Sequence, residues 1–274
     1  MTESQSDRAA PAIAMRAVSE EEIAFLFDHG WVKLPRLIDQ ATATALLGRA
    51  QRLLGDDGRR GIENEAKATE SYETWFRSVP DGGGDELFQA LRTSEELGRN
   101  AARMLCRDSS IRMMMNSVMA KLPNDRAKGS STYFHQDTPG HMYLEANFLT
   151  TWIALDHVTA EMGAMQFYAG SHKLGNLGQF KDLWQDWGPL LERTTSLTDP
   201  VCLAPGDATV HLNGTIHGTG PNLGTRPRWS WAGVTVPGDA RYTGAKNGYL
   251  DGLGLEPYGM IEHPKFPVIY RPAP

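Results

Sequence analysis

The chain has 274 residues, of which 41% are hydrophobic and 22% charged, and its net charge is -6. This length provides a sizeable core and fits one large domain or two small ones. The negative charge argues against nucleic acid as a partner, and no apolar run approaches the length that crosses a membrane. Residues 1–15 lack the pattern of a signal peptide. Cys106 and Cys202 lie in no CxxC pair, and we expect two buried thiols in a cytoplasmic protein.

The first hundred residues have the features of helices. Residues 1–16 are polar and Ala-rich, which predicts a flexible tail before a single folded domain at 17–274. Ser19 and Glu22 form a capping box ahead of an apolar segment, so a helix should begin there. The following elements are a turn at Gly30 with a short strand that stops at Pro35, a helix at 40–55, a polar Gly-rich loop at 56–85, and a helix at 85–106.

From Ser110 onward, short apolar segments alternate with turn signals, which is typical of antiparallel strands. There is no βαβ alternation, no GxGxxG and no GxxxxGK[ST], which argues against a dinucleotide-binding or P-loop fold. We therefore predict a mainly β fold with flanking helices, built on a double-stranded β-helix of the jelly-roll, cupin-like kind. The segments expected as strands are 111–122, 147–158, 164–170, 208–214 and 228–236.

His135 and Asp137 are separated by one residue in the stretch YFHQDTPG. In a strand, residues i and i+2 point to the same side, so both side chains could converge while Gln136 faces away. Imidazole with carboxylate suits iron(II), manganese or zinc. The alternative is a surface turn that contains both residues by chance, because the DTPG that follows is turn-like.

A third ligand is available in the segment 208–231, which contains His211 and His217. His217 ends an apolar strand, and Arg228 follows eleven residues later with Ser230 two residues beyond it. Arg228 and Ser230 would share one strand face and offer a guanidinium fork and a hydroxyl to a dicarboxylate. The alternative is a surface cation and a turn histidine.

The motifs together resemble the phytanoyl-CoA dioxygenase-like oxygenases, which are iron(II)- and 2-oxoglutarate-dependent enzymes on a double-stranded β-helix. The resemblance extends from about residue 20 to 235. It is carried by FLFDHGWVKLPRLID, by AKLP before the HQD motif, by HQD itself, by TAEMGAMQFYAGSHKLG, and by PGDATVHLNGTIHGTGPN with Arg228 after it.

The resemblance implies the residues of a site for iron(II), 2-oxoglutarate and dioxygen. His135, Asp137 and His217 would form a facial triad, and Arg228 with Ser230 would hold the far carboxylate of the cosubstrate. Trp152 and Ser117 would be further cosubstrate contacts, although Ser117 departs from the family in residue type. Related halogenases replace the carboxylate of the triad with a small residue, so Asp137 favours oxygen transfer or oxidative rearrangement.

Several other residues and one segment also have candidate roles. We read His211 as a structural residue or a neighbour of the ligands, on the same strand as His217. Residues 179–191 could form an amphipathic helix or a lid over the site. A small organic substrate, of secondary metabolism by preference, would undergo hydroxylation, desaturation or rearrangement; the alternatives are a cupin-type metal-dependent hydrolase or isomerase, and a binding protein without activity. Candidate substrate contacts are Tyr133, Phe148, Gln166 and Trp231, each equally explained by core packing, and His141, equally explained by solvent exposure.

Overall fold

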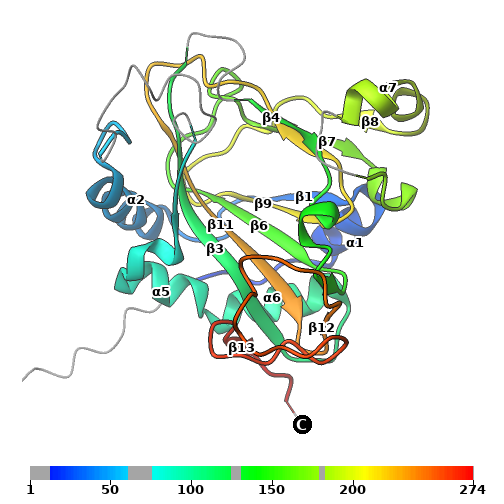
Figure 1. Ribbon diagram of the computed structural model, residues 1–274. Helices are drawn as coiled ribbons and strands as arrows, with labels where there is room; N and C mark the ends of the chain where they lie inside the picture. The colour runs from blue at the N-terminus through cyan, green and yellow to red at the C-terminus, as the bar shows by residue number, and fades with distance from the viewer. Residues whose placement is uncertain (1–12, 61–75, 125–130, 179–182, 274) are drawn as a thin grey trace, which may run out of the picture.

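In the computed structural model, residues 13–60, 76–124, 131–178 and 183–273 are described. Two antiparallel sheets face each other, and helices cover the far side of the larger one (Figure 1). This is the predicted mainly β architecture with flanking helices, and it confirms the double-stranded β-helix fold class. The helices are α1 (Glu20–His29), α2 (Gln40–Leu54), α5 (Glu86–Arg92), α6 (Glu95–Leu105) and α7 (Leu183–Thr194), with 3-10 turns η1 (Asp81–Gly84), η2 (Thr138–His141) and η3 (Ser171–Leu174).

The larger sheet supplies the scaffold of the molecule. Within the described residues it has seven strands in the order β1-β9-β6-β11-β3-β13, with β2 also paired to β3. These strands are β1 (Trp31–Leu34), β2 (Phe76–Pro80), β3 (Ile111–Lys121), β6 (Leu149–Ala154), β9 (Ala208–Leu212), β11 (Arg228–Pro237) and β13 (Val268–Tyr270). All of its pairings are antiparallel.

The smaller sheet has four described strands in the order β4-β10-β7-β8, and a separate pair joins β12 to β5. The segments expected as strands at 111–122, 147–158, 164–170, 208–214 and 228–236 are therefore confirmed as β3, β6, β7, β9 and β11. The remaining bounds are β4 (Thr132–His135), β5 (Leu144–Glu145), β7 (Met165–Ala169), β8 (Ser196–Leu197), β10 (His217–Thr219) and β12 (Arg241–Tyr242).

The capping box at the start of α1 is confirmed. The Ser19 side chain accepts a hydrogen bond from the backbone of Glu22, and the Glu22 side chain accepts one from the backbone of Ser19. Gly30 ends the helix with φ of 81°, a left-handed conformation that favours glycine. The tail predicted for residues 1–16 is too long, because Ile13 is buried and Met15 pairs with Ile38.

Two other element predictions need correction. The single helix expected at 85–106 is two helices, α5 and α6, because the Ser94 side chain accepts a bond from Leu97 N–H and so caps a new helix. The loop expected at 56–85 contains β2, whose backbone pairs with β3; residues 61–75 of that prediction lie outside the described residues. Cys106 and Cys202 are both free and exposed, so the predicted burial of the thiols is wrong.

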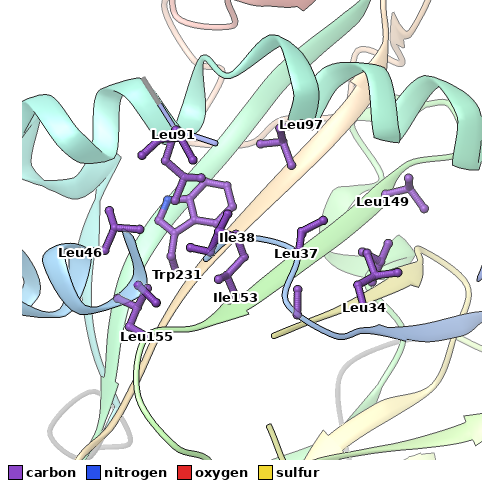
Figure 2. Packing of buried hydrophobic residues seen from close by; sticks show 14 of the residues in the cluster. Leu34, Leu37, Ile38, Leu46, Leu91, Leu97, Leu149, Ile153, Leu155 and Trp231 are labelled. Atoms are coloured by element: carbon purple, nitrogen blue, oxygen red, sulfur yellow. The ribbon is translucent and has the colours of Figure 1, made fainter. Parts of the chain in front are cut away.

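The two faces of the larger sheet have different partners. Trp231 points to the outer face, where it packs among Leu46, Leu91 and Ile153 beneath the helices (Figure 2). The inner face carries Trp152, Ala154, Met119 and Ala232, which pack against Met165 and Phe167 of the smaller sheet. Any site between the sheets is therefore built from inner-face residues.

Trp231 cannot be the substrate contact that the sequence suggested. Its side chain is fully buried in the outer core, and its indole N–H donates to Asn116 Oδ1. It lies three positions after Arg228, and an odd spacing places two strand residues on opposite faces.

None of the described helices combines the length and the apolar character that a transmembrane segment requires.

Candidate active site

Three side chains converge between the two sheets. One ligand atom from each of His135, Asp137 and His217 lies within 4.8 Å of the others. Asp137 Oδ1 is 3.7 Å from His135 Nε2 and 3.8 Å from His217 Nε2. A cation about 2.1 Å from each ligand needs ligand atoms roughly 3 Å apart, so a small inward shift of these side chains would close around an ion.

Strand register places the two imidazoles together. His135 at the end of β4 is the direct partner of His217 at the start of β10, and their rings lie 4.4 Å apart. Asp137, in contrast, is not on the strand as expected. Its backbone is helical, with φ of -72° and ψ of -30°, and it leads into η2. The carboxylate therefore reaches the site from a turn.

Hydrogen bonds fix the imidazoles in the form that binds metal. His135 Nδ1 lies 2.7 Å from Tyr133 O, and His217 Nδ1 lies 3.0 Å from Thr215 O. A carbonyl only accepts, so each Nδ1 carries the proton and leaves the Nε2 lone pair facing the centre. Burial, with His211 and His135 nearby, lowers the pKa of His217 well below its usual value, which keeps the ring neutral.

The carboxylate of Asp137 is oriented in the same way. Its Oδ2 accepts a hydrogen bond of 2.6 Å from the Thr150 hydroxyl and lies 3.2 Å from His211 Nε2. The other oxygen, Oδ1, therefore faces His135 and His217. Burial alone would raise the pKa of Asp137, but the imidazoles, His217 first, hold it well below its usual value. Asp137 is therefore an ionised ligand.

His211 is a partner of this carboxylate. It lies on β9 in the larger sheet, so the expectation that it shares a strand with His217 is wrong; the two rings face each other from different sheets, 4.0 Å apart. Behind the ligands, Gln136 is 1% exposed and does face away. Its amide donates to Gly175 O and Gly214 O, which holds the HxD segment in place.

The residues expected to hold a cosubstrate share the inner face of the larger sheet. Arg228 and Ser230 alternate along β11 and are 2% and 1% exposed. Trp152 and Ser117 are both cross-strand partners of Ala232, so they lie on this same face. The Arg228 guanidinium lies 5.1 Å from the centre of the Trp152 ring, a distance at which a cation and an aromatic ring attract each other.

Two residues of this pocket were missed by the sequence reasoning. Lys121 is the direct partner of Arg228 on β3, is 0% exposed, and donates to Thr219 Oγ1. Thr219 follows His217 by two residues on β10 and so shares its face. A lysine at an inward position of an apolar strand was the available signal, because lysine is almost never fully buried without a polar partner.

The remaining candidate substrate contacts differ in their position relative to the three converging side chains. Tyr133 is 64% exposed and precedes His135 by two residues on β4. His141 Nδ1 lies 2.9 Å from Asp137 O, and its ring centre is 4.9 Å from that of the buried Phe148. Gln166 is not a substrate contact, because its amide donates to Thr198 O on the outer side of the smaller sheet.

The helix α7 also lies on the outer side of the smaller sheet. Leu191 is buried against Tyr168 and Ile216, while Trp187 is partly exposed. This arrangement favours the amphipathic helix over a lid for the part of the segment that the structure describes; residues 179–182 lie outside it.

The model of the phytanoyl-CoA dioxygenase (PhyH) family matches residues 27–230 of this chain. The chain belongs to this family. It is thus an iron(II)- and 2-oxoglutarate-dependent dioxygenase.

Two curated relatives are similar in sequence. "Dioxygenase lolE1" of Epichloe uncinata is 24% identical over 217 residues, which cover 75% of this chain and 77% of the relative. A "probable alpha-ketoglutarate-dependent hypophosphite dioxygenase" of Stutzerimonas stutzeri is 30% identical over 128 residues, 42% of each chain.

Among the solved structures that share the fold of this PhyH-family chain are those of SnoK and SnoN. The non-heme alpha ketoglutarate dependent carbocyclase SnoK from nogalamycin biosynthesis has a TM-score of 0.72 and 24% identity, and the match covers 91% of this chain and 96% of SnoK. The epimerase SnoN, solved in complex with Fe3+, alpha ketoglutarate and nogalamycin RO, has a TM-score of 0.71 and 24% identity, with 91% and 98% covered.

Proposed function

We propose that this dioxygenase oxidises a small organic molecule of secondary metabolism, by hydroxylation, desaturation or oxidative rearrangement, at a cation held by His135, Asp137 and His217. The observation that carries the proposal is the orientation of the three ligands. The Nε2 atoms of two imidazoles and Oδ1 of one carboxylate face one point, and each side chain is oriented by a hydrogen bond on its far side.

Two imidazoles and one carboxylate are the donor set of non-haem iron(II) oxygenases, which leaves further coordination positions open. When bound, the iron and 2-oxoglutarate supply the oxidising chemistry. Asp137 would neutralise one positive charge of the ion through Oδ1. His211 and Thr150 would keep that oxygen aimed at the metal, since both already occupy Oδ2.

We assign the far carboxylate of 2-oxoglutarate to Arg228 and Ser230. The guanidinium offers two parallel N–H donors. Ser230 Oγ is buried and has no hydrogen-bond partner among the described residues, so it could donate to a bound carboxylate. Trp152 would pack along the carbon chain. Burial of this pocket strengthens each interaction, because the local dielectric constant is low.

We assign the substrate to the side of the metal centre that carries Tyr133, His141 and Phe148. Nε2 of His141 is buried without a partner in the described part of the chain and could bond a polar group of the substrate. The similar enzymes SnoK and SnoN are both from nogalamycin biosynthesis, which supports a substrate of secondary metabolism. The free thiols Cys106 and Cys202 support a cytoplasmic location.

The test is an assay of purified protein loaded with iron(II) under nitrogen and then supplied with 2-oxoglutarate and oxygen. We expect succinate release that requires both iron and 2-oxoglutarate, and its loss in Asp137→Ala. Gln166→Ala is the matched control, since Gln166 lies on the outer side of the sheet, and it should keep wild-type turnover. Turnover supported by zinc without 2-oxoglutarate would instead identify a hydrolase or isomerase.

A further inference from the structure

The inner face of the larger sheet continues as an apolar surface past the cosubstrate residues. Val234 follows Ala232 by two positions on β11, and Met115 is its direct partner on β3, so both share the inner face. Val234 belongs to a second hydrophobic cluster, and Met115 packs against it. A substrate on this side of the metal centre therefore meets mainly apolar side chains. The other buried members of the cluster are Met114, Tyr143, Leu144, Phe148, Val236, Ala240, Leu250, Ile261 and Phe266.

Two polar groups beside this cluster have no partner. Nε2 of His141 is buried and makes no hydrogen bond in the described part of the chain. Tyr143 is 3% exposed, and its hydroxyl makes no hydrogen bond to any described residue. The two ring centres are 5.6 Å apart. An unpaired polar group in apolar surroundings costs free energy, so a ligand that pairs with both groups gains from binding here.

The two groups have opposite hydrogen-bonding roles. His141 Nδ1 lies 2.9 Å from Asp137 O, and a carbonyl only accepts, so Nδ1 carries the proton of the neutral ring and Nε2 is an acceptor. Burial first, then Tyr249 and the Asp137 carboxylate, raise the pKa of Tyr143, so its phenol stays protonated and can donate. One hydroxyl group satisfies both, because its hydrogen donates to Nε2 while its oxygen accepts from the phenol.

We propose that the substrate is a neutral, largely apolar alcohol or phenol, whose hydroxyl donates to His141 Nε2 and accepts from the hydroxyl of Tyr143. The inference rests on the proposed function and names the substrate class of the same site. Neither partner is a cation, so a carboxylate or phosphate placed there would gain no counter-charge from them. The Lys265 ammonium beside the cluster already donates to Tyr249 O and lies 3.6 Å from the centre of the Tyr249 ring.

The test compares three probes with one ring system: 1-naphthol, 1-methoxynaphthalene, which accepts but cannot donate, and the anion 1-naphthoate. Binding is measured by calorimetry under nitrogen, on protein loaded with iron(II) and 2-oxoglutarate. We expect 1-naphthol to bind roughly tenfold more tightly than either of the other two, because it alone pairs with both groups. Equal affinity for all three, tighter binding of the anion, or no binding of 1-naphthol would overturn the proposal.

Two variants separate the two contacts. Tyr143→Phe removes the donor, so it should weaken 1-naphthol and the ether alike, by about 5- to 10-fold. His141→Asn can keep a donor to Asp137 O but has no atom at the place of Nε2, so it should weaken 1-naphthol alone and abolish its preference over the ether. Tyr270→Phe is the matched control, since Tyr270 lies on β13 against the outer core, and it should keep all three affinities.

Tyr143→Phe keeps the test decisive if His141→Asn loses metal binding, because it changes a side chain that is not bonded to Asp137. Wild-type affinities in this variant would disprove the role of Tyr143. If wild-type protein releases succinate with iron and 2-oxoglutarate but shows no preference among the probes, the substrate class is wrong and the proposed function stands. If it releases no succinate, the proposed function itself fails, whichever probe binds.

Discussion

Replacing Thr150 with valine tests whether the far side of Asp137 controls metal binding. Valine has nearly the same shape as threonine, so the change removes the 2.6 Å hydrogen bond to Asp137 Oδ2 and little else. A hydrogen bond to an ionised group contributes about 1.5–3 kcal/mol. His211 remains on the same oxygen at 3.2 Å, so we expect the lower part of that range, or about a 10- to 30-fold loss of iron affinity.

The measurement is an anaerobic titration of apoprotein with iron(II), or with cobalt(II) as a spectroscopic substitute. Thr151→Val is the matched control. Thr151 is the next residue on β6 and points to the opposite face, where its buried hydroxyl has no hydrogen-bond partner within the described residues. This control should bind metal like the wild type. Equal affinity in Thr150→Val and wild type, or equal loss in both variants, would refute the assigned role of the hydrogen bond.

Three further predictions address other parts of the molecule. Arg228→Ala should raise KM for 2-oxoglutarate at least tenfold and leave iron(II) affinity unchanged; an unaltered KM would contradict the assigned carboxylate contact. Trp231→Ala should lower the free energy of unfolding by about 3–5 kcal/mol, measured by denaturant titration. The folded fraction should keep wild-type KM values; an altered KM for the substrate would show that Trp231 contacts it. At pH 8, 2-oxoglutarate binding should take up protons. Burial first, and Arg228 second, lower the pKa of Lys121 to about 6, so the amine is mostly neutral before the carboxylate arrives. Affinity should therefore weaken as pH rises above 6, and calorimetry in buffers of different ionisation enthalpy should detect an uptake that Lys121→Met abolishes.

Local signals in the sequence were sufficient for the element types. The capping box of Ser19 and Glu22 and the alternation along β3, β6 and β11 depend on neighbouring residues alone. The break between α5 and α6 was missed because the helical pattern continues across it, and only the cap at Ser94 interrupts it. Strand β2 was missed because it ends at Pro80 and Gly82, Gly83 and Gly84 follow it, a composition that resembles a loop.

The site required information that spacing does not contain. The HxD motif correctly predicted that His135 and Asp137 lie together. It did not reveal that the backbone of Asp137 leaves the strand and leads into η2. Pairing of His135 with His217 joins segments 82 residues apart by number, and no local pattern specifies that register. Trp231 and Gln166 were assigned to the wrong face, although counting in steps of two from Arg228 and from Phe167 would have excluded them.

The strand β4 lies at one end of the four-stranded sheet, and β10 is its only neighbour among the described strands. It has four residues, and the last of them carries an imidazole of the metal centre. An ion shared by His135 and His217 would tie this edge strand to its neighbour, as a disulfide does in a secreted protein. Loss of iron should then loosen the sheet first at β4, so amide hydrogen exchange there would report metal occupancy independently of turnover.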